Sequence, residues 1–150
     1  MDDRLFKTAM SKFSTGVTVI TAEWENENHG MTANAFMSVS LDPKLIVISV
    51  ANNARMKPIL EKTKTFAVSV LAEDQADVSM HFARQKEKEN VRLIEFAGVP
   101  TVEGAIATIA CDLHDTSEQG DHTLFIGKVR DVAVTDRDPL VYYQGKYEQI

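Results

Sequence analysis

The alternation of apolar and polar residues along the chain predicts a few short helices. Apolar side chains recur at helical spacing over residues 5–13, Asp2 or Asp3 can cap this helix, and Gly16 stands where it would end. A second short helix is expected over residues 56–60, and a third begins with Asp74 as its cap and runs through Phe82. These helices are short and lie far apart in the sequence.

Runs of β-branched and apolar residues predict that strands dominate the rest of the chain. They fall at residues 17–25, 39–50, 65–71, 105–112, 122–134 and 140–143, with a break at Asp42-Pro43. Residues 26–30 indicate a hairpin-like turn, and the charged residues 84–92 indicate a loop. Because helices and strands do not alternate regularly, a doubly wound parallel sheet is disfavoured. A single, mainly β domain over residues 1–150, a closed antiparallel barrel with peripheral helices, fits better.

The charge balance argues against nucleic acid as a partner. The chain has 16 basic and 22 acidic side chains, a net charge of −6, whereas a nucleic-acid-binding barrel needs a basic groove with stacking aromatic residues. One tryptophan and three tyrosines supply few such residues. A local basic excess remains at Arg55, Lys57, Lys62 and Lys64. This excess is compatible with an anion site and equally with a solvated helix face.

Cysteine content and hydropathy predict a cytosolic protein without membrane contact. Cys111 is the only cysteine, so no intramolecular disulfide can form and a reducing compartment is expected. The first residues are acidic and polar, unlike a signal peptide. The longest purely aliphatic run, residues 45–48, is far too short to span a membrane.

Residues 30–41 have an unusual composition for a strand region. Small and hydroxyl-bearing residues (Thr32, Ala33, Asn34, Ala35, Ser38, Ser40) are interleaved with Met31, Phe36 and Met37. Small side chains allow a flat ligand to approach the backbone, and N–H, hydroxyl and amide groups can bond the edge of a ring such as isoalloxazine. On pattern alone, a polar-faced strand with a Ser/Thr-rich turn is the more ordinary interpretation.

Two other segments carry residues with binding chemistry. In residues 120–127, His122 stands at the mouth of a predicted strand, where it can contact a substrate or remain a half-exposed surface histidine. In residues 80–84, Arg84 follows a short helix, where its guanidinium can clamp a phosphate or simply interact with the helix dipole. Each alternative stays open at this point.

Several common site signatures are missing from the sequence. No G-x-G-x-x-G or P-loop appears, so neither a Rossmann dinucleotide site nor a P-loop is supported. No nucleophile motif stands out, and the spacing of Cys111, His114 and His122 matches no common zinc site. The motifs therefore indicate no metal site, and they single out no catalytic acid, base or nucleophile.

Five pieces of the sequence, in order, resemble the short-chain flavin reductase family. They are FSTGVTVIT (13–21), HGMTANAFMSVSLDP (29–43), FAVSVL (66–71), GDHTLFIG (120–127) and PLVYY (139–143). The second and fourth pieces are long and specific, and together the five span essentially the whole chain. The likeness is closest to the reductase component of two-component phenol or 4-hydroxyphenylacetate hydroxylases.

The resemblance implies a split β-barrel with Greek-key connections and a homodimer with the flavin near the subunit interface. It implies an NAD(P)H:flavin oxidoreductase that passes reduced flavin to a separate aromatic monooxygenase. FAD is the first expectation with FMN also open, and NADH is preferred with NADPH open. The cofactors carry the hydride transfer, so no side chain needs to be a nucleophile or base. The alternative is a split-barrel protein that binds flavin without turning it over.

The same resemblance assigns residues to the two ligands. It implies flavin binding by Thr32, Asn34, Ala35, Phe36, Met37, Ser38, Val39, Ser40, Ala51, Lys57, Phe82, Ala83 and Arg84. Of these, residues 34–40 would line the ring and ribityl chain, and Ala51, Lys57 and residues 82–84 would meet the rest, including the phosphates. His122 would lie by the nicotinamide, with Tyr147 nearby.

Overall fold

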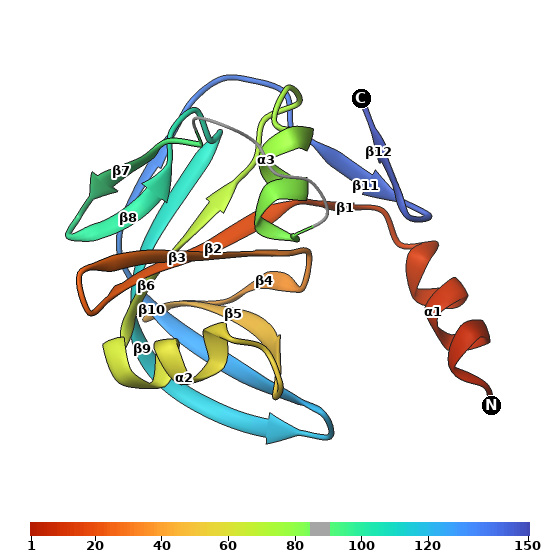
Figure 1. Cartoon of the computed structure of the whole chain (residues 1–150), viewed down its shortest axis with the longest axis horizontal. Helices are drawn as coiled ribbons and strands as arrows, with labels where there is room; N and C mark the ends of the chain where they lie inside the picture. Colours follow the sequence, from red (N-terminus) through yellow and green to blue (C-terminus); the bar gives the residue numbers. More distant parts are fainter. Residues whose placement is uncertain (85–90) are drawn as a thin grey trace.

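A computed structural model describes residues 1–84 and 91–150, and it is dominated by strands (Figure 1). The helices of this part are α1 (Asp3–Ser11), α2 (Met56–Thr63) and α3 (Ala76–Phe82). Its strands are β1 (Thr15–Gly16), β2 (Thr18–Trp24), β3 (Glu27–Ala33), β4 (Phe36–Leu41), β5 (Lys44–Ala51), β6 (Thr65–Val70), β7 (Leu93–Phe96), β8 (Val99–Val102), β9 (Ala107–Gln119), β10 (His122–Val134), β11 (Val141–Tyr143) and β12 (Lys146–Glu148).

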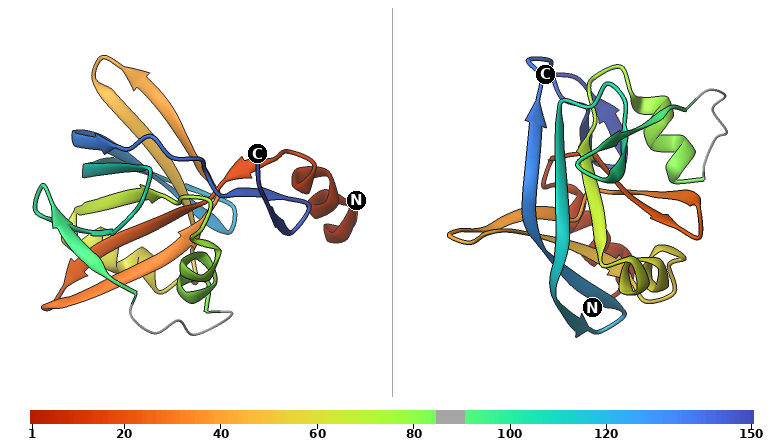
Figure 2. Two further views of the ribbon diagram at one scale, coloured as in Figure 1. Left: turned by 90° about the horizontal axis from the view of Figure 1, so that it is seen from above. Right: turned by 90° about the vertical axis from the view of Figure 1, so that its left-hand side faces the viewer.

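Seven strands form one strongly curled sheet with the order β3-β2-β6-β9-β10-β5-β4 (Figures 1 and 2). All its pairings are antiparallel, and neighbours such as β2 and β6 are not consecutive in the chain, as Greek-key connections require. In the described residues β3 and β4 are edge strands that do not pair with each other. The predicted mainly β split barrel is confirmed, but the expectation of a closed barrel is wrong, because the sheet stays open between these edges.

The interior of the curled sheet holds an apolar core cluster. Phe66 and Phe125 are its largest fully buried side chains, and α2 adds Met56, Ile59 and Leu60 from one face. Burial of each of these large apolar side chains away from water contributes about 1.5–3 kcal/mol to folding stability. The periodicity that predicted α2 thus corresponds to the face that the helix buries.

A glycine on β10 permits unusually close packing within this core. A Cβ at Gly127 would lie 2.8 Å from Cζ of Phe66 and 2.9 Å from Cβ of Cys111. Cys111 is a fully buried free thiol, and burial raises its pKa to about 12. The thiol therefore stays protonated at any physiological pH.

The first helix has an apolar face that nothing in the described chain covers. Asp2 caps α1 as predicted, its carboxylate accepting a 2.7 Å hydrogen bond from the Leu5 N–H, but the helix ends at Ser11, well before Gly16. No residue of α1 is buried, and Phe6 and Met10 are more than half exposed. The helix extends away from the barrel, beside the small β1-β11-β12 sheet (Figure 1, Figure 2).

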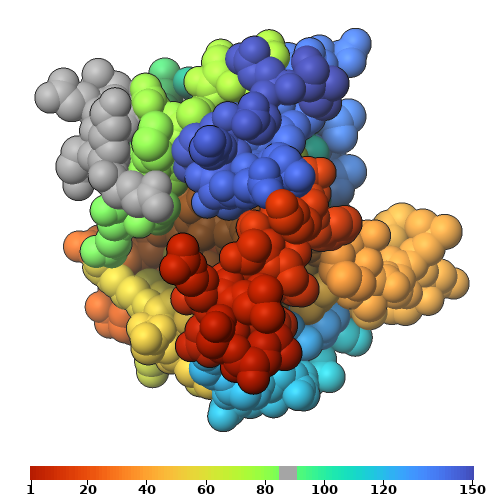
Figure 3. Space-filling model, turned by 90° about the vertical axis from the view of Figure 1, so that its right-hand side faces the viewer, coloured from red at the N-terminus to blue at the C-terminus, as the bar shows by residue number. Residues whose placement is uncertain are grey.

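The β4–β5 hairpin also stands apart from the body of the molecule. It projects at the right of Figure 3, in orange, and its apolar residues Met37, Val39 and Leu41 are exposed. A register shift between Ser38 and Ser40 marks a bulge in β4. Such bulges are common at sheet edges, where they alter the direction of side chains.

Two expectations about local structure are wrong. The turn before β3 is formed by Glu25 and Asn26, both with positive φ, so that residues 27–30 belong to the strand instead of the turn. Asp74 does not cap α3. It pairs with Arg137 at 2.7 Å, and Gln75 stands at the N-cap position without a side-chain capping bond.

Other differences concern the extent of strands. β9 runs to Gln119, seven residues beyond the predicted end, and the sequence pattern did not indicate β7, β8 or β12. Most of the predicted loop over residues 84–92 lies outside the described residues. No helix in the described ranges is long and apolar enough to cross a membrane.

Candidate functional site

Residues 30–41 connect the two open edges of the large sheet. Their first part belongs to β3, Asn34 and Ala35 form the link, and the rest is β4. Edge strands carry backbone N–H and C=O groups that no neighbouring strand uses. The segment with the unusual composition therefore lies where the barrel is split, along two strand edges that do not pair with each other.

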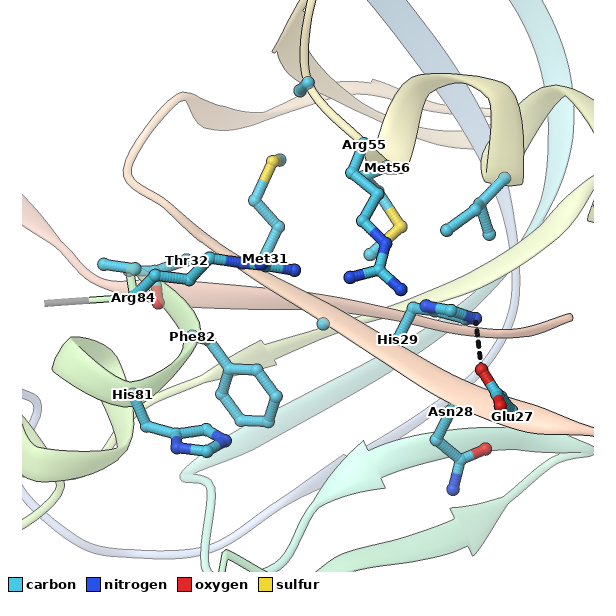
Figure 4. A pocket seen from close by; sticks show the side chains of 14 residues that line it. Glu27, Asn28, His29, Met31, Thr32, Arg55, Met56, His81, Phe82 and Arg84 are labelled. Carbon is cyan, nitrogen blue, oxygen red and sulfur yellow. Dashed lines mark ion pairs between the residues drawn. The ribbon is translucent and has the colours of Figure 1, made fainter. Parts of the chain in front are cut away.

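A cavity of about 940 Å³ lies beside β3. Three elements line it: β3, the start of α2 and the end of α3 (Figure 4). The lining residues are Glu27, Asn28, His29, Gly30, Met31, Thr32, Ala54, Arg55, Met56, Ile59, His81, Phe82, Ala83 and Arg84. The cavity brings together segments separated by more than 50 residues in the sequence, and it is large enough for a nucleotide-sized ligand.

Positive and titratable side chains converge on this cavity from different elements. In Figure 4, Arg55 at the start of α2 and Arg84 at the end of α3 point into the same space. His29 lies between them and Glu27, with 4.0 Å from its Nε2 to the Glu27 carboxylate. In a chain of net charge −6, two guanidinium groups beside one cavity favour an anionic ligand, phosphate above all.

Arg84 reaches the cavity because of how α3 ends. Ala83 is the C-cap, and Arg84 follows in the left-handed region with φ of 59°, its N–H donating to the carbonyl oxygen of His81 at 3.0 Å. Glycine is the usual residue at this position, and a residue with a side chain costs about 1 kcal/mol or more there. Such strain in a cavity wall is typical of functional positions.

Close packing between β3 and α3 forms one wall of the cavity. A Cβ at Gly30 would lie 2.5 Å from two ring carbons of Phe82, so only glycine leaves room for the ring. Phe82 in turn meets the His81 ring edge-on, with 4.8 Å between centroids. The apolar face of Phe82 therefore rests directly on the backbone of β3.

A smaller cavity of about 170 Å³ adjoins the first. It is lined by Val17, Thr32, Ala33, Asn34, Ser79, Ala83, Tyr142 and Tyr147. The Tyr142 and Tyr147 rings, from β11 and β12, lie 5.5 Å apart. Thr32 and Ala83 line both cavities, so the two spaces share one wall.

The structure brings some of the predicted residues together and separates others. Those that line a cavity are Thr32, Asn34, Phe82, Ala83, Arg84 and Tyr147. Those that line neither are Ala35, Phe36, Met37, Ser38, Val39, Ser40, Ala51, Lys57 and His122. Most of the second group belongs to β4 or to β5 and β10, the two strands nearest to it in the sheet.

His122 is the first residue of β10 and lies opposite Ala51 of β5. Its Nδ1 is 2.7 Å from the Asp121 carboxylate, and the hydrogen bond with His122 holds the pKa of Asp121 below its usual value. Asn52 joins this corner, since Thr123 donates to its side-chain oxygen at 2.6 Å. His122 and Tyr147 are thus placed at different parts of the same chain.

The sequence did not single out Arg55 or His29 as site residues. Arg55 was part of the basic excess over residues 55–64, and of those four residues it alone lines the larger cavity. His29 stands inside the second resembling piece, next to Gly30. That Arg55 and His29 line the same cavity becomes apparent only when the fold places α2 against β3.

Comparison with known proteins identifies the family. The sequence profile of the flavin reductase like domain matches residues 10–150. An NADH-dependent flavin reductase from a Rhodococcus species is 43% identical over 148 residues, 96% of this chain and 84% of that protein. The reductase component of 4-hydroxyphenylacetate 3-monooxygenase from Thermus thermophilus is 42% identical over 146 residues, 97% and 95% of the two chains. The chain belongs to the flavin reductase-like family.

Solved structures agree with this assignment. The flavin reductase PheA2 in its native state has 50% sequence identity and a TM-score of 0.98, covering 100% of this chain and 99% of that one. The NADH:FAD oxidoreductase SgcE6 of Streptomyces globisporus, in complex with NAD and FAD fragments, has 36% identity and a TM-score of 0.92, over 99% and 93% of the two chains. The predicted family, fold and enzyme class are confirmed.

Proposed function

We propose that this chain is an NADH-dependent flavin reductase that supplies reduced flavin to a separate monooxygenase. The observation that carries the proposal is the cavity beside β3, where Arg55 and Arg84 converge next to the small-residue segment that joins the sheet edges. Relatives named as NADH-dependent flavin reductases support the same chemistry. A monooxygenase partner is supported by relatives named as reductases of monooxygenases, the 4-hydroxyphenylacetate 3-monooxygenase reductase component and the styrene monooxygenase flavin reductase.

The described residues fit a flavin nucleotide. The ring would lie along the split between β3 and β4, where Thr32 and Asn34 offer hydrogen-bonding groups at the edge of the sheet. The phosphates would lie in the larger cavity between Arg55 and Arg84. Arginine matches phosphate with paired N–H donors, and charge-assisted bonds of this kind are the strong ones.

The chain's own contribution to catalysis is to hold and orient two ligands. When bound, the flavin supplies the chemistry, because its ring accepts a hydride from the nicotinamide of NADH. Thr32 and Asn34 are placed to fix one edge of the ring, while Tyr147 and His122 would hold the dinucleotide. Phe82, packed against Gly30, holds one wall of the cavity in place. Orientation of this kind brings the reacting atoms to about 3–3.5 Å.

We further propose that two copies of the chain form the working unit. Apolar residues are exposed on α1 and on β4, and large exposed apolar patches mark interaction sites. A second copy covering these faces would also account for the separation of His122 from Tyr147 in one chain, because His122 could then meet the dinucleotide bound at the other chain's split, beside that chain's Tyr147. The free buried thiol of Cys111 favours a cytosolic location.

FAD is our first choice of cofactor, with FMN as an expected weaker ligand. The ring and first phosphate are common to both, and relatives include an NADH-dependent FAD reductase of Streptomyces globisporus and an FMN reductase of Agrobacterium fabrum. For the nicotinamide substrate, NADH is preferred over NADPH, since relatives are named for NADH.

The test begins with the purified protein, its visible spectrum and chromatographic identification of any released flavin. Anaerobic addition of NADH to protein with FAD or FMN should bleach the flavin absorbance over many turnovers. A protein that binds flavin but oxidises no NADH would instead be a flavin-binding split barrel without turnover. Absence of flavin binding would overturn both proposals.

A further inference from the structure

Ser79, in the middle of α3, joins three separate segments of the chain. Its side chain is 1% exposed, and its Oγ lies 2.7 Å from the hydroxyl of Tyr147 on β12. Its carbonyl oxygen accepts a hydrogen bond of 2.6 Å from Oγ1 of Thr32 on β3 and one of 3.0 Å from the N–H of Ala83. A single residue thus connects a sheet edge, the C-terminal hairpin and the last turn of its own helix.

The partners of Ser79 are the residues around which the two cavities meet. Thr32 and Ala83 line both cavities, and Ser79 and Tyr147 line the smaller one. The next residue after Ala83 is Arg84, and the one before it is Phe82, both in the wall of the larger cavity. Movement of Ser79 would therefore displace the residues that form the wall between the two cavities.

We propose that Ser79 is a positioning residue for hydride transfer. It fixes the end of α3 against Thr32 and Tyr147, and so sets the spacing between the flavin along β3 and the nicotinamide near Tyr147. The assignment rests on the proposed function. A misplacement of about 1 Å between reacting groups can lower a rate roughly a hundredfold, so a small shift of this wall is enough to matter.

An equivalent hydrogen bond elsewhere in the fold provides a matched control. Thr101 is also 1% exposed, and its Oγ1 donates to the carbonyl oxygen of Ile94 at 2.9 Å. It lines neither cavity. Loss of either hydroxyl removes one buried hydrogen bond, so the two losses should lower the melting temperature similarly.

The experiment compares Ser79→Ala, Tyr147→Phe, the double variant and Thr101→Val. Four quantities are measured: the melting temperature, the flavin dissociation constant, the single-turnover rate of flavin reduction at saturating NADH, and the long-wavelength charge-transfer absorbance of stacked nicotinamide and flavin. We expect Ser79→Ala and Tyr147→Phe each to lower the rate roughly tenfold and to weaken the charge-transfer absorbance. Flavin affinity should stay within about twofold, and the double variant should be no slower than the slower single one, because both changes break the same bond.

Several results would overturn the assignment. They are a wild-type rate in Ser79→Ala, additive losses in the double variant, or an equal rate loss in Thr101→Val. If Ser79→Ala does not fold, Tyr147→Phe decides the question by the same rate and absorbance, because Tyr147 is the partly exposed partner in this hydrogen bond. A wild-type protein that does not oxidise NADH would overturn the proposed function and this assignment together, whereas an active wild type with unaffected variants would overturn the assignment alone.

Discussion

The two halves of residues 30–41 differ sharply although they are continuous in sequence and alike in composition. The β3 half is partly buried, packs against Phe82 and lines both cavities. The β4 half projects from the molecule, exposes Met37, Val39 and Leu41, and lines neither cavity. One half of the candidate flavin site is therefore built within a single chain, whereas the other half has a surface that one chain leaves uncovered.

Composition alone therefore does not distinguish a complete binding surface from an incomplete one. Small and hydroxyl-bearing residues allow close approach in both halves, but only β3 has α2 and α3 against it. For β4 we propose that the missing neighbour is a second copy. Four sets of variants test this division, and they follow in decreasing order of the change that each should produce.

Charges on the β4 half should separate the two copies. In the double variant Met37→Glu/Leu41→Glu, carboxylates replace side chains that are 59% and 79% exposed in one chain. Burial of each apolar side chain contributes about 1.5–3 kcal/mol, and a symmetric dimer loses each twice, so the dimer dissociation constant should rise at least roughly a hundredfold. Analytical ultracentrifugation measures it. Ile94→Glu, on β7 at the opposite side of the molecule from α1, is the control and should remain dimeric.

The larger cavity should depend on Arg55 more than on Lys57. Hydrogen bonds to a charged group contribute about 1.5–3 kcal/mol, so Arg55→Ala should raise the dissociation constants of FAD and FMN roughly tenfold or more. Riboflavin, which has no phosphate, should bind unchanged. Lys57→Ala changes the same charge two residues away but outside the cavity. A larger loss in Lys57→Ala, measured by flavin fluorescence, would mean that the phosphates lie elsewhere.

The contact between Gly30 and Phe82 offers a test of the β3 half alone. In Gly30→Ala the new Cβ would lie 2.5 Å from the Phe82 ring, which must then leave its place on β3. Overpacking of this kind lowers folding stability by about 1–3 kcal/mol. Because the displaced ring also forms the cavity wall, flavin affinity should fall up to roughly tenfold. Gly16→Ala is a matched control, since nothing lies within 4 Å of its Cβ position. Restored affinity in Gly30→Ala/Phe82→Ala would attribute the loss to the ring.

His122 should have the smallest effect, and on the dinucleotide only. Loss of one hydrogen bond of about 0.5–1.5 kcal/mol in His122→Ala predicts an apparent KM for NADH that is roughly two- to tenfold higher, with flavin affinity unchanged. Gln119→Ala, at the paired position on β9, is the control. Because the hydrogen bond with His122 lowers the pKa of Asp121, the His122 variant should also raise that pKa toward its ordinary value, which NMR titration can follow. A change in flavin affinity alone would contradict the role.

Local signals in the sequence were enough for the mainly β fold and for part of the candidate site. The cap and periodicity of α1 could be predicted because they depend on neighbours along the chain. The strand that begins at His122 could be predicted for the same reason. The Asp74 cap was predicted wrongly because a long-range partner, Arg137, takes its carboxylate. The Gly30–Phe82 contact joins residues 52 positions apart, and no local pattern indicates it.

The same limit explains which site residues were found. Thr32, Asn34 and Arg84 were singled out because composition and a helix end are visible in the sequence itself. Arg55 could not be separated from Lys57, Lys62 and Lys64, since only the docking of α2 on β3 decides which basic residue lines the cavity. The sequence likewise offered no sign that the apolar face of α1 would stay uncovered.

The tight packing around Cys111 has a consequence for how long such an enzyme can work in air. Reduced flavin that meets oxygen before it meets its partner generates hydrogen peroxide, which attacks thiolates far faster than thiols. With its pKa raised to about 12 and no exposed surface, the sulfur of Cys111 is neither ionised nor reachable. The core thus protects the chain's only thiol from the by-product of its own reaction.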